Sequence, residues 1–311
     1  MNELASSSEF LSIVLTIITA ATPLLLAALG ELVVERSGVL NLGVEGMMAV
    51  GAVCGFGAAL SFGPYVGIFA AIAAGVLLAL LFGFLTLSLV SNQVATGLAL
   101  TLLGLGLSGL IGERYVGQPG EKLRRLHIPG LSDIRFLGPI VFGQDVLVYV
   151  ALGLTVAIGY VLFRTKLGLI IRAVGDSHQS AHALGYGVIP VRYACVAFGG
   201  GCAGLAGGYL SLAYTTQWVE NMTAGRGWIA LALVVFGSWL PRRVAIGAYL
   251  FGAISILGFA VQTKGLNIPS QLLSSLPYIV TIVALVIISG NRALTRANTP
   301  TCLGQPFVPD R

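Results

Sequence analysis

Charge is nearly absent from a long stretch of this chain. Between Arg36 and Glu113 the only charged side chain is Glu45. A helix that crosses a bilayer needs about 20 apolar residues, so this interval is long enough for roughly three crossings. Over all 311 residues, 56% are hydrophobic and 9% are charged, whereas a soluble domain carries about 25% charged residues. The sequence therefore predicts an integral membrane protein.

Apolar runs define the expected spans. They lie at about 10–29, 44–62, 65–90, 93–111, 144–163, 193–212, 228–240, 245–263 and 274–290. They predict an all-α, polytopic bundle of about 8–10 transmembrane helices that forms one domain over residues 1–311. The run 228–240 is short for a hydrocarbon core about 30 Å thick, which indicates a broken or re-entrant segment. The ridge Gly200, Gly204, Gly208 is expected to be a helix-packing surface.

The loops carry unequal numbers of basic residues. Alternating the spans places 164–192, 241–244 and the C-terminal tail 291–311 on one face, together with 31–36 and 91–92. That face holds ten of the 17 Lys and Arg residues. The positive-inside rule then predicts that 164–192 is cytoplasmic and that the polar loop 112–143 is extracytoplasmic. The N-terminus is expected outside and the C-terminus inside.

Two halves are expected, over about 10–140 and 144–290, and each contains a glycine-punctuated segment. These segments are 37–51, which reads SGVLNLGVEGMMAVG, and 225–237, which reads GRGWIALALVVFG. Paired interrupted segments in corresponding halves are typical of a solute path near the bilayer midplane. Ordinary entry from a loop into a helix is the alternative.

Asn41 and Glu45 are the first candidates for a solute path. A carboxylate at membrane depth usually faces a cavity or a partner group. If the stretch is helical, Asn41 and Glu45 share one face, and Gly43 and Gly46 allow another backbone to approach. A purely structural role at a helix break is the alternative.

Gln93 and Thr96 are the second candidates, with Asn92 and Thr101 beside them. These uncharged hydrogen-bonding groups suit a polyhydroxyl or heterocyclic solute better than an ion. Hydroxyl groups in membrane helices also bond to the carbonyl of the preceding turn, and that bonding is the structural alternative.

The polar segment 164–192 is long for an idle connection. Asp176 or Ser177 can cap a short helix that runs to Leu184, and Gly185 can end that helix. A capped helix on the cytoplasmic face is a docking element. A solvated loop is the alternative.

Several kinds of chemistry lack their residues. No lysine stands in the G-x-x-x-x-G-K-[ST] pattern, so the chain is not expected to bind ATP through a P-loop. His127, His178 and His182 all lie in loops, which leaves no catalytic cluster within the spans. We expect no catalytic residue, metal site or disulfide, and no nucleic-acid partner. Too few ionisable residues lie in the spans for an evident proton or sodium relay.

The run from Glu35 to Met48, ERSGVLNLGVEGMM, resembles the signature of ABC permeases in the branched-chain amino acid and simple-sugar group. Three further stretches resemble the branch that imports nucleosides and purine-like solutes. They are 93–101 (QVATGLALT), 172–175 (RAVG) with 181–185, and 277–282 (PYIVTI). The resemblance covers about residues 30–290. It implies a multi-pass permease of the bacterial cytoplasmic (inner) membrane that imports a nucleoside by alternating access.

The resemblance also implies partners. The permeases of this family act in pairs, usually non-identical, on two ATPase subunits that bind ATP and Mg²⁺, and they receive solute from an extracytoplasmic binding protein or lipoprotein. The family's coupling segment corresponds to 172–187. Its expected ATPase-coupling residues are Arg172, Gly175, Asp176, Ala181 and Gly185. Ser177, His178, His182 and Tyr186 depart from the family pattern, which suggests a different fit to the ATPase.

Two other functions stay open at this point. One is an ABC permease for a simple sugar or another solute. The other is an ion-coupled carrier that acts alone.

Overall fold

The computed structural model describes residues 2–121, 123, 126, 138–263, 271–272, 275–276, 279–280, 282–283, 286 and 298–308. Every regular element in this part of the chain is a helix. The elements are α1 (Asn2–Arg36), α2 (Val44–Phe62), α3 (Pro64–Gly83) with the π-turn η1 (Phe84–Ser88), α4 (Gln93–Gly112) with the 3₁₀ turn η2 (Glu113–Tyr115), η3 (Gly138–Phe142), α5 (Val146–Arg164), α6 (Lys166–Asp176), α7 (His178–Ala183), α8 (Val188–Tyr209) with η4 (Leu210–Tyr214), α9 (Arg226–Phe236) and α10 (Pro241–Thr263).

Short polar residues begin two of the long helices. The side chain of Asn92 accepts a hydrogen bond from Ala95 N (3.0 Å) and caps α4. The Asp145 carboxylate accepts from Leu147 N and Val148 N and caps α5. These caps supply acceptors to N–H groups that have no partner within the helix. They explain why the apolar runs become helical where they do.

Six helical segments of the described residues are long and apolar enough to cross a membrane. They are Phe10–Arg36, Val44–Phe62, Pro64–Ser88, Gln93–Tyr115, Val146–Arg164 and Val188–Tyr214. Each overlaps one of the first six apolar runs, which confirms the all-α polytopic architecture. The run 228–240 forms the half-length helix α9, and 245–263 lies in α10. The expected span 274–290 falls mostly outside the described residues, as do His127 and much of the loop 112–143.

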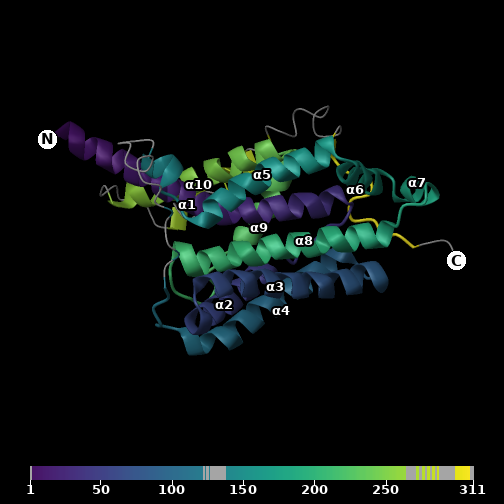
Figure 1. Cartoon of the computed structure of the whole chain (residues 1–311), viewed down its shortest axis with the longest axis horizontal. Helices are drawn as coiled ribbons and strands as arrows, with labels where there is room; N and C mark the ends of the chain where they lie inside the picture. The colour runs from purple at the N-terminus through teal and green to yellow at the C-terminus, as the bar shows by residue number, and fades with distance from the viewer. Residues whose placement is uncertain are drawn as a thin grey trace.

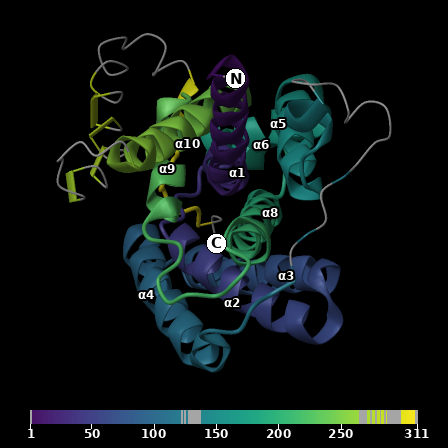
Figure 2. The same cartoon turned by 90° about the vertical axis from the view of Figure 1, so that its left-hand side faces the viewer.

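The helices lie side by side along the long axis of the molecule (Figure 1). Seen along that axis, α2, α3 and α4 form one group, while α1, α5, α9 and α10 form another, with α8 between them (Figure 2). The two termini lie at opposite ends (Figure 1). The helix α8 is therefore the central element that holds the two groups together.

The glycine ridge of α8 explains how closely the central helices pack. A Cβ atom added to Gly75 of α3 would collide with the carbonyl oxygen of Gly200, and one added to Gly51 of α2 would collide with that of Gly204. Gly208 faces the side chain of Ala71. The absence of side chains lets three backbones come into contact, as the sequence predicts.

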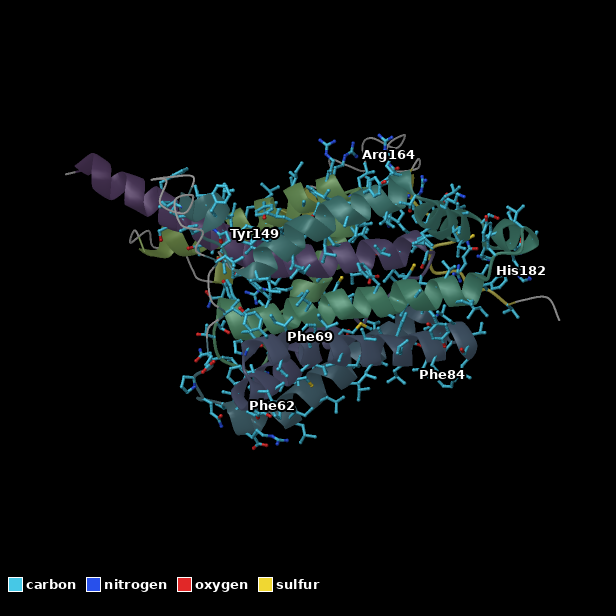
Figure 3. The ribbon with its side chains drawn as sticks, viewed as in Figure 1. Phe62, Phe69, Phe84, Tyr149, Arg164 and His182 are labelled. Atoms are coloured by element: carbon cyan, nitrogen blue, oxygen red, sulfur yellow. The ribbon has the colours of Figure 1, made fainter. Side chains whose placement is uncertain are left out.

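Large apolar side chains cover the outer face of α3. Phe62, just before α3, is 74% exposed, and Phe69 is 72% exposed. Figure 3 shows Phe62, Phe69 and Phe84 spread along the lower group of helices. Such a surface is costly in water but not against lipid tails. The chain is thus a multi-pass membrane protein.

Candidate functional site

The connection between α1 and α2 is the first part of the site. Residues 37–43 leave the helical path at Gly38, which has φ +85°. The side chain of Asn41 accepts from Gly43 N (2.9 Å), and its backbone N donates to Glu31 Oε1 (3.2 Å). Asn41 is fully buried. Because it precedes α2, it does not share a helical face with Glu45, yet it shapes the turn that leads to Glu45.

Glu45 joins the two interrupted segments that the sequence singles out. Its carboxylate accepts from Gly225 N (2.8 Å) and from Gly227 N (2.6 Å), at the start of α9. Glu45 is only 3% exposed. A carboxylate at a helix N-terminus accepts hydrogen bonds from free N–H groups, and its negative charge is attracted to the positive end of the helix dipole. The two segments, 180 residues apart, therefore meet at one carboxylate in the interior.

Gln93 and Thr101 attach α4 to the same connection. Gln93 Oε1 accepts from Leu40 N (2.8 Å), and Thr101 Oγ1 donates to Leu42 O (2.9 Å). The side-chain nitrogen of Gln93 is buried without a hydrogen-bond partner. Buried amide donors are normally satisfied, so this N–H₂ group is an exception among the described residues.

Thr96 lies apart from this group. Its hydroxyl oxygen is 2.9 Å from that of Ser91, in the turn that precedes α4. The structure thus gathers Asn41, Glu45 and Gln93 around the α1–α2 connection, whereas the described contact of Thr96 is with Ser91. The assignment of all four to a solute path remains a prediction.

Glu35, Arg36 and Trp239 form a buried polar cluster at the end of α1 that the sequence did not predict. Glu35 Oε2 accepts from Trp239 Nε1 (2.6 Å), and the Arg36 guanidinium donates to the carbonyl oxygen of Trp239 (3.0 Å from Nη2). The sequence analysis placed 31–36 in a loop, but α1 continues to Arg36. Glu31 and Glu35 are four residues apart, and this spacing is the signal that they face one side of a helix.

The polar segment 164–192 forms two short helices. Thr165 caps α6, where its Oγ1 accepts from Gly168 N (3.2 Å). Ser177 caps α7, where its Oγ accepts from Ser180 N (3.3 Å). Gly185 follows α7 with φ +86°. The predicted capped helix is confirmed with Ser177 as its cap, and α6 adds a second helix before it.

The predicted coupling residues meet α1 and α5. A Cβ atom on Gly175 would collide with the carbonyl oxygen of Arg36. The Arg172 guanidinium lies over the ring of Phe163, 5.2 Å from its centre. Ala181 is buried against Val174 and Val188, while Asp176 is exposed. Segment 172–185 is therefore packed directly on the end of α1, next to the connection that carries Asn41.

The C-terminal segment ties these parts together. Cys302 N donates to Gly175 O (2.9 Å), and Gly304 N donates to Gly38 O (3.1 Å). The ring of Phe307 lies 5.2 Å from that of His178 and 5.3 Å from that of His182. Residues 302–307 therefore bridge the coupling helices and the α1–α2 connection.

Arg192 of α8 sits at the centre of this bridge. Its Nε donates to Ser37 O (3.2 Å) and its Nη1 to Gln305 O (3.0 Å), while Nη2 lies 3.4 Å from His178 Nδ1. Arg192 is 1% exposed. Burial, and then the Arg192 charge, lower the pKa of His178 below its usual value. We call Arg192, His178 and residues 302–307 the C-terminal clasp. Nothing in the sequence pattern predicts it, because residues 302–307 are more than 100 residues from His178 and Arg192.

The described residues contain no group of three His, Cys, Asp or Glu side chains that could hold a metal ion. The candidate site is instead a set of hydrogen bonds around two helix breaks, with helices α6 and α7 attached at one end.

Comparison with known proteins adds a family match. The model of a family described as the permease component of branched-chain amino acid transport systems matches residues 13–289. No solved structure matches this chain.

Three curated relatives cover nearly all of the chain. It is 41% identical to a putative glucose ABC transporter permease protein of Haloferax volcanii, over 93% of this chain and 95% of that protein. It is 35% identical to the guanosine ABC transporter permease protein NupQ of Bacillus subtilis (96% and 98%), and 31% identical to a nucleoside ABC transporter permease protein of Lactococcus lactis (92% and 95%). NupP, a second guanosine permease protein of Bacillus subtilis, is 25% identical over 281 residues.

Proposed function

Because the chain belongs to the family of permease components of branched-chain amino acid transport systems, we propose that it carries a nucleoside or a related small polar solute through an ATP-driven importer. The observation that carries this choice of solute is the match of 35% identity, over nearly the full length of both chains, to a guanosine permease. A purine nucleoside is uncharged and rich in donors and acceptors. Uncharged groups such as the unpaired side-chain nitrogen of Gln93 suit such a solute.

Glucose is the second candidate solute. The relative from Haloferax volcanii, at 41% identity, is named for glucose transport. A sugar is also uncharged and hydrogen-bonding, so the groups around the α1–α2 connection do not exclude it. The two candidates differ in the flat aromatic base, and transport measurements separate them.

ATP would drive transport from outside this chain. We propose that separate ATPase subunits bind ATP and Mg²⁺ and dock on α6 and α7, where Arg172, Gly175, Asp176, Ala181 and Gly185 lie. Movement of this segment would act on the end of α1 through the contact of Gly175 with the Arg36 carbonyl. It would also reach the α1–α2 connection through the C-terminal clasp.

Alternating access then follows from the position of Glu45. The connection 37–43 leads into Glu45, which holds the start of α9. A shift of the connection would change how the two broken segments meet, and the solute path would open to one side at a time. Asn41, Glu45, Gln93 and Thr96 are the proposed lining or gating residues of that path. A second permease and an extracytoplasmic binding protein or lipoprotein complete the proposed importer.

Reconstitution tests this function. The complex is purified with its ATPase, its second permease and its binding protein, and it is placed in liposomes. Uptake is compared with ATP inside the liposomes and with ATP outside them. We expect ATP-dependent uptake of radiolabelled guanosine that excess unlabelled glucose does not reduce. Uptake of glucose and not of guanosine would show that the solute is a sugar rather than a nucleoside. Uptake by this chain alone, driven by an ion gradient, would overturn the ATP-driven mechanism.

A charge reversal at Asp176 tests the docking segment. Gly175 is unsuitable, because any side chain there collides with Arg36. Asp176 is exposed; its carbonyl oxygen accepts from Cys302 Sγ, and its carboxylate charge is attracted to that of Arg36, so assembly of the variant is checked first. We expect Asp176→Arg to lower ATP-dependent uptake at least tenfold in a complex that still assembles. Glu113→Arg, an exposed carboxylate at the end of α4, is the matched control.

A further inference from the structure

A groove on the outer side of α5 takes no part in the proposed solute path. It lies between α5 and the start of α10 and has a volume of about 870 Å³. Its wall on α5 extends from Thr155 to Arg164, and its wall on the α10 side extends from Leu240 to Ile246. At 1.5 Å per residue, the α5 wall is about 14 Å long. The groove therefore follows the membrane-spanning part of α5.

The walls of this groove are largely apolar. Val156, Tyr160 and Ile246 are 74%, 63% and 68% exposed. The hydroxyl group of Thr155 donates to Ala151 O in its own helix (2.8 Å), so it requires no partner in the groove. Because this apolar groove lies within the bilayer, a soluble protein does not reach it, whereas the hydrocarbon chain of a lipid does.

One end of the groove is strongly basic. Arg164, Arg242 and Arg243 line it, and no Asp or Glu is among the lining residues. The ring of Phe163, also in the lining, has the guanidinium groups of Arg36 and Arg172 against it at 5.6 Å and 5.2 Å from its centre. Three arginines thus line this end of the groove, and two more lie against the Phe163 ring outside the lining.

The basic end is also the end of the molecule that carries the coupling helices. Figure 3 shows Arg164 toward the same end as His182, whereas Tyr149 lies toward the other. The distribution of Lys and Arg residues predicts that this end is cytoplasmic. Basic pockets between transmembrane helices on that side bind anionic lipid headgroups.

We propose that this groove binds one anionic phospholipid. Its phosphate lies among Arg164, Arg242 and Arg243, and one acyl chain lies along the apolar walls of α5 and α10. Guanidinium groups bind phosphate by charge-assisted hydrogen bonds, often two at a time. The bound lipid fills the space between α5 and α10 and joins the helix that precedes α6 to the helix that follows α9.

Lipid retention tests the headgroup site. The complete complex is equilibrated in nanodiscs of phosphatidylglycerol and phosphatidylcholine in equal amounts, released, and weighed by native mass spectrometry. We expect retained phosphatidylglycerol on the wild type and a loss of about 100-fold in Arg164→Gln/Arg242→Gln/Arg243→Gln, since each of the three cations near the surface contributes about 1 kcal/mol, or about fivefold. Arg114→Gln, at the opposite end of the molecule, should retain the lipid.

A plug tests the acyl-chain site without changing charge. A Cβ atom on Gly159, which lines the groove, or on Gly153, which does not, meets no other atom within 4 Å. Both positions therefore have open space at the Cβ atom, from which a leucine side chain extends outward. We expect Gly159→Leu to release the phospholipid and Gly153→Leu to retain it.

Three results would overturn the proposal. Equal retention of phosphatidylcholine would show that the arginines do not select an anionic headgroup. Unchanged retention in Gly159→Leu would show that the chain does not lie in the groove. Loss of the ATPase subunit from the arginine variant, with phosphatidylglycerol retained, would assign the arginines to ATPase docking instead. None of these results depends on which solute is transported.

Discussion

Glu45 is the residue on which the contact between the two broken segments depends. Glu45→Ala would leave the N–H groups of Gly225 and Gly227 without their acceptor in the interior. Each unsatisfied buried group costs about 1–3 kcal/mol, so we expect a loss of about 3 kcal/mol in stability. Glu45→Gln keeps one acceptor oxygen and should lose less. Thermal unfolding in detergent, followed by tryptophan fluorescence, measures both.

Glu113→Ala is the control for this experiment, because Glu113 is an exposed carboxylate near the end of α4. Its unfolding temperature should stay at that of the wild type. If Glu45→Ala unfolds at the wild-type temperature as well, the carboxylate does not hold α9, and Glu45 would be free for a direct contact with solute.

Arg192 is the residue that connects the coupling helices to the α1–α2 connection. A lysine at this position keeps the charge, but a single ammonium group cannot reproduce the forked donors that reach Ser37 O and Gln305 O. We expect Arg192→Lys to lower uptake about tenfold or more while the complex still hydrolyses ATP. Coupled assays of both activities in liposomes measure this separation.

Labelling of Cys302 reports on the clasp in the same variant. Cys302 N donates to Gly175 O, so the thiol should become more reactive toward a maleimide when residues 302–307 detach. A Cys54→Ala background removes the other partly exposed thiol. Arg114→Lys serves as the control. If uptake and labelling in Arg192→Lys equal those of the wild type, the clasp does not connect movement of α6 and α7 to the α1–α2 connection.

At the scale of elements, the clasp should open in acid. Burial and the Arg192 charge lower the pKa of His178 in the folded clasp, whereas a solvated histidine titrates near pH 6.5. Between these two values the detached form binds the proton and the clasped form does not. Clasp stability is therefore full above about pH 6.5 and decreases as the pH falls below it.

Cys302 labelling measures this pH dependence as well. The wild-type rate is divided by the rate in His178→Gln at each pH, because this ratio cancels the intrinsic titration of the thiol and any effect of His182. We expect the ratio to rise as the pH decreases from about 7 to about 5. A flat ratio would show that His178 does not titrate on detachment.

The helices were more predictable than the contacts between them. Apolar runs placed α2 and α4 almost to the residue, because hydrophobicity and caps are local properties. The predicted end of α1 was wrong. Charged residues such as Glu31 and Glu35 are typical of loops, and only the structure shows that both are buried. For the candidate site, sequence spacing identified Glu45 and Ser177. Arg192 and Trp239 stayed hidden because Ser37 and Gln305, which accept from Arg192, and Glu35, which accepts from Trp239, lie more than 100 residues away from them.

At the scale of the molecule, the two groups of helices are joined in few places. The helix α8 packs between them: Gly200 and Gly204 contact the backbones of α3 and α2, and Gly199 contacts the backbone of Gly30 in α1, which leaves little room for adjustment. The Glu45 contact with α9 is hydrogen-bonded, whereas the clasp combines hydrogen bonds with the packing of Phe307 on Val174, Ala181 and Val188. We expect the proposed alternating access to change these two contacts rather than the packing of α8.

The last prediction concerns assembly. Bacillus subtilis has two guanosine permease proteins, NupQ and NupP, and this chain is 35% identical to the first and 25% to the second. We expect the purified importer to contain one copy of this chain and one copy of a different permease. Native mass spectrometry of the complex, with a tag on this chain alone, counts both. Two copies of this chain in one complex, with uptake intact, would show that it pairs with itself.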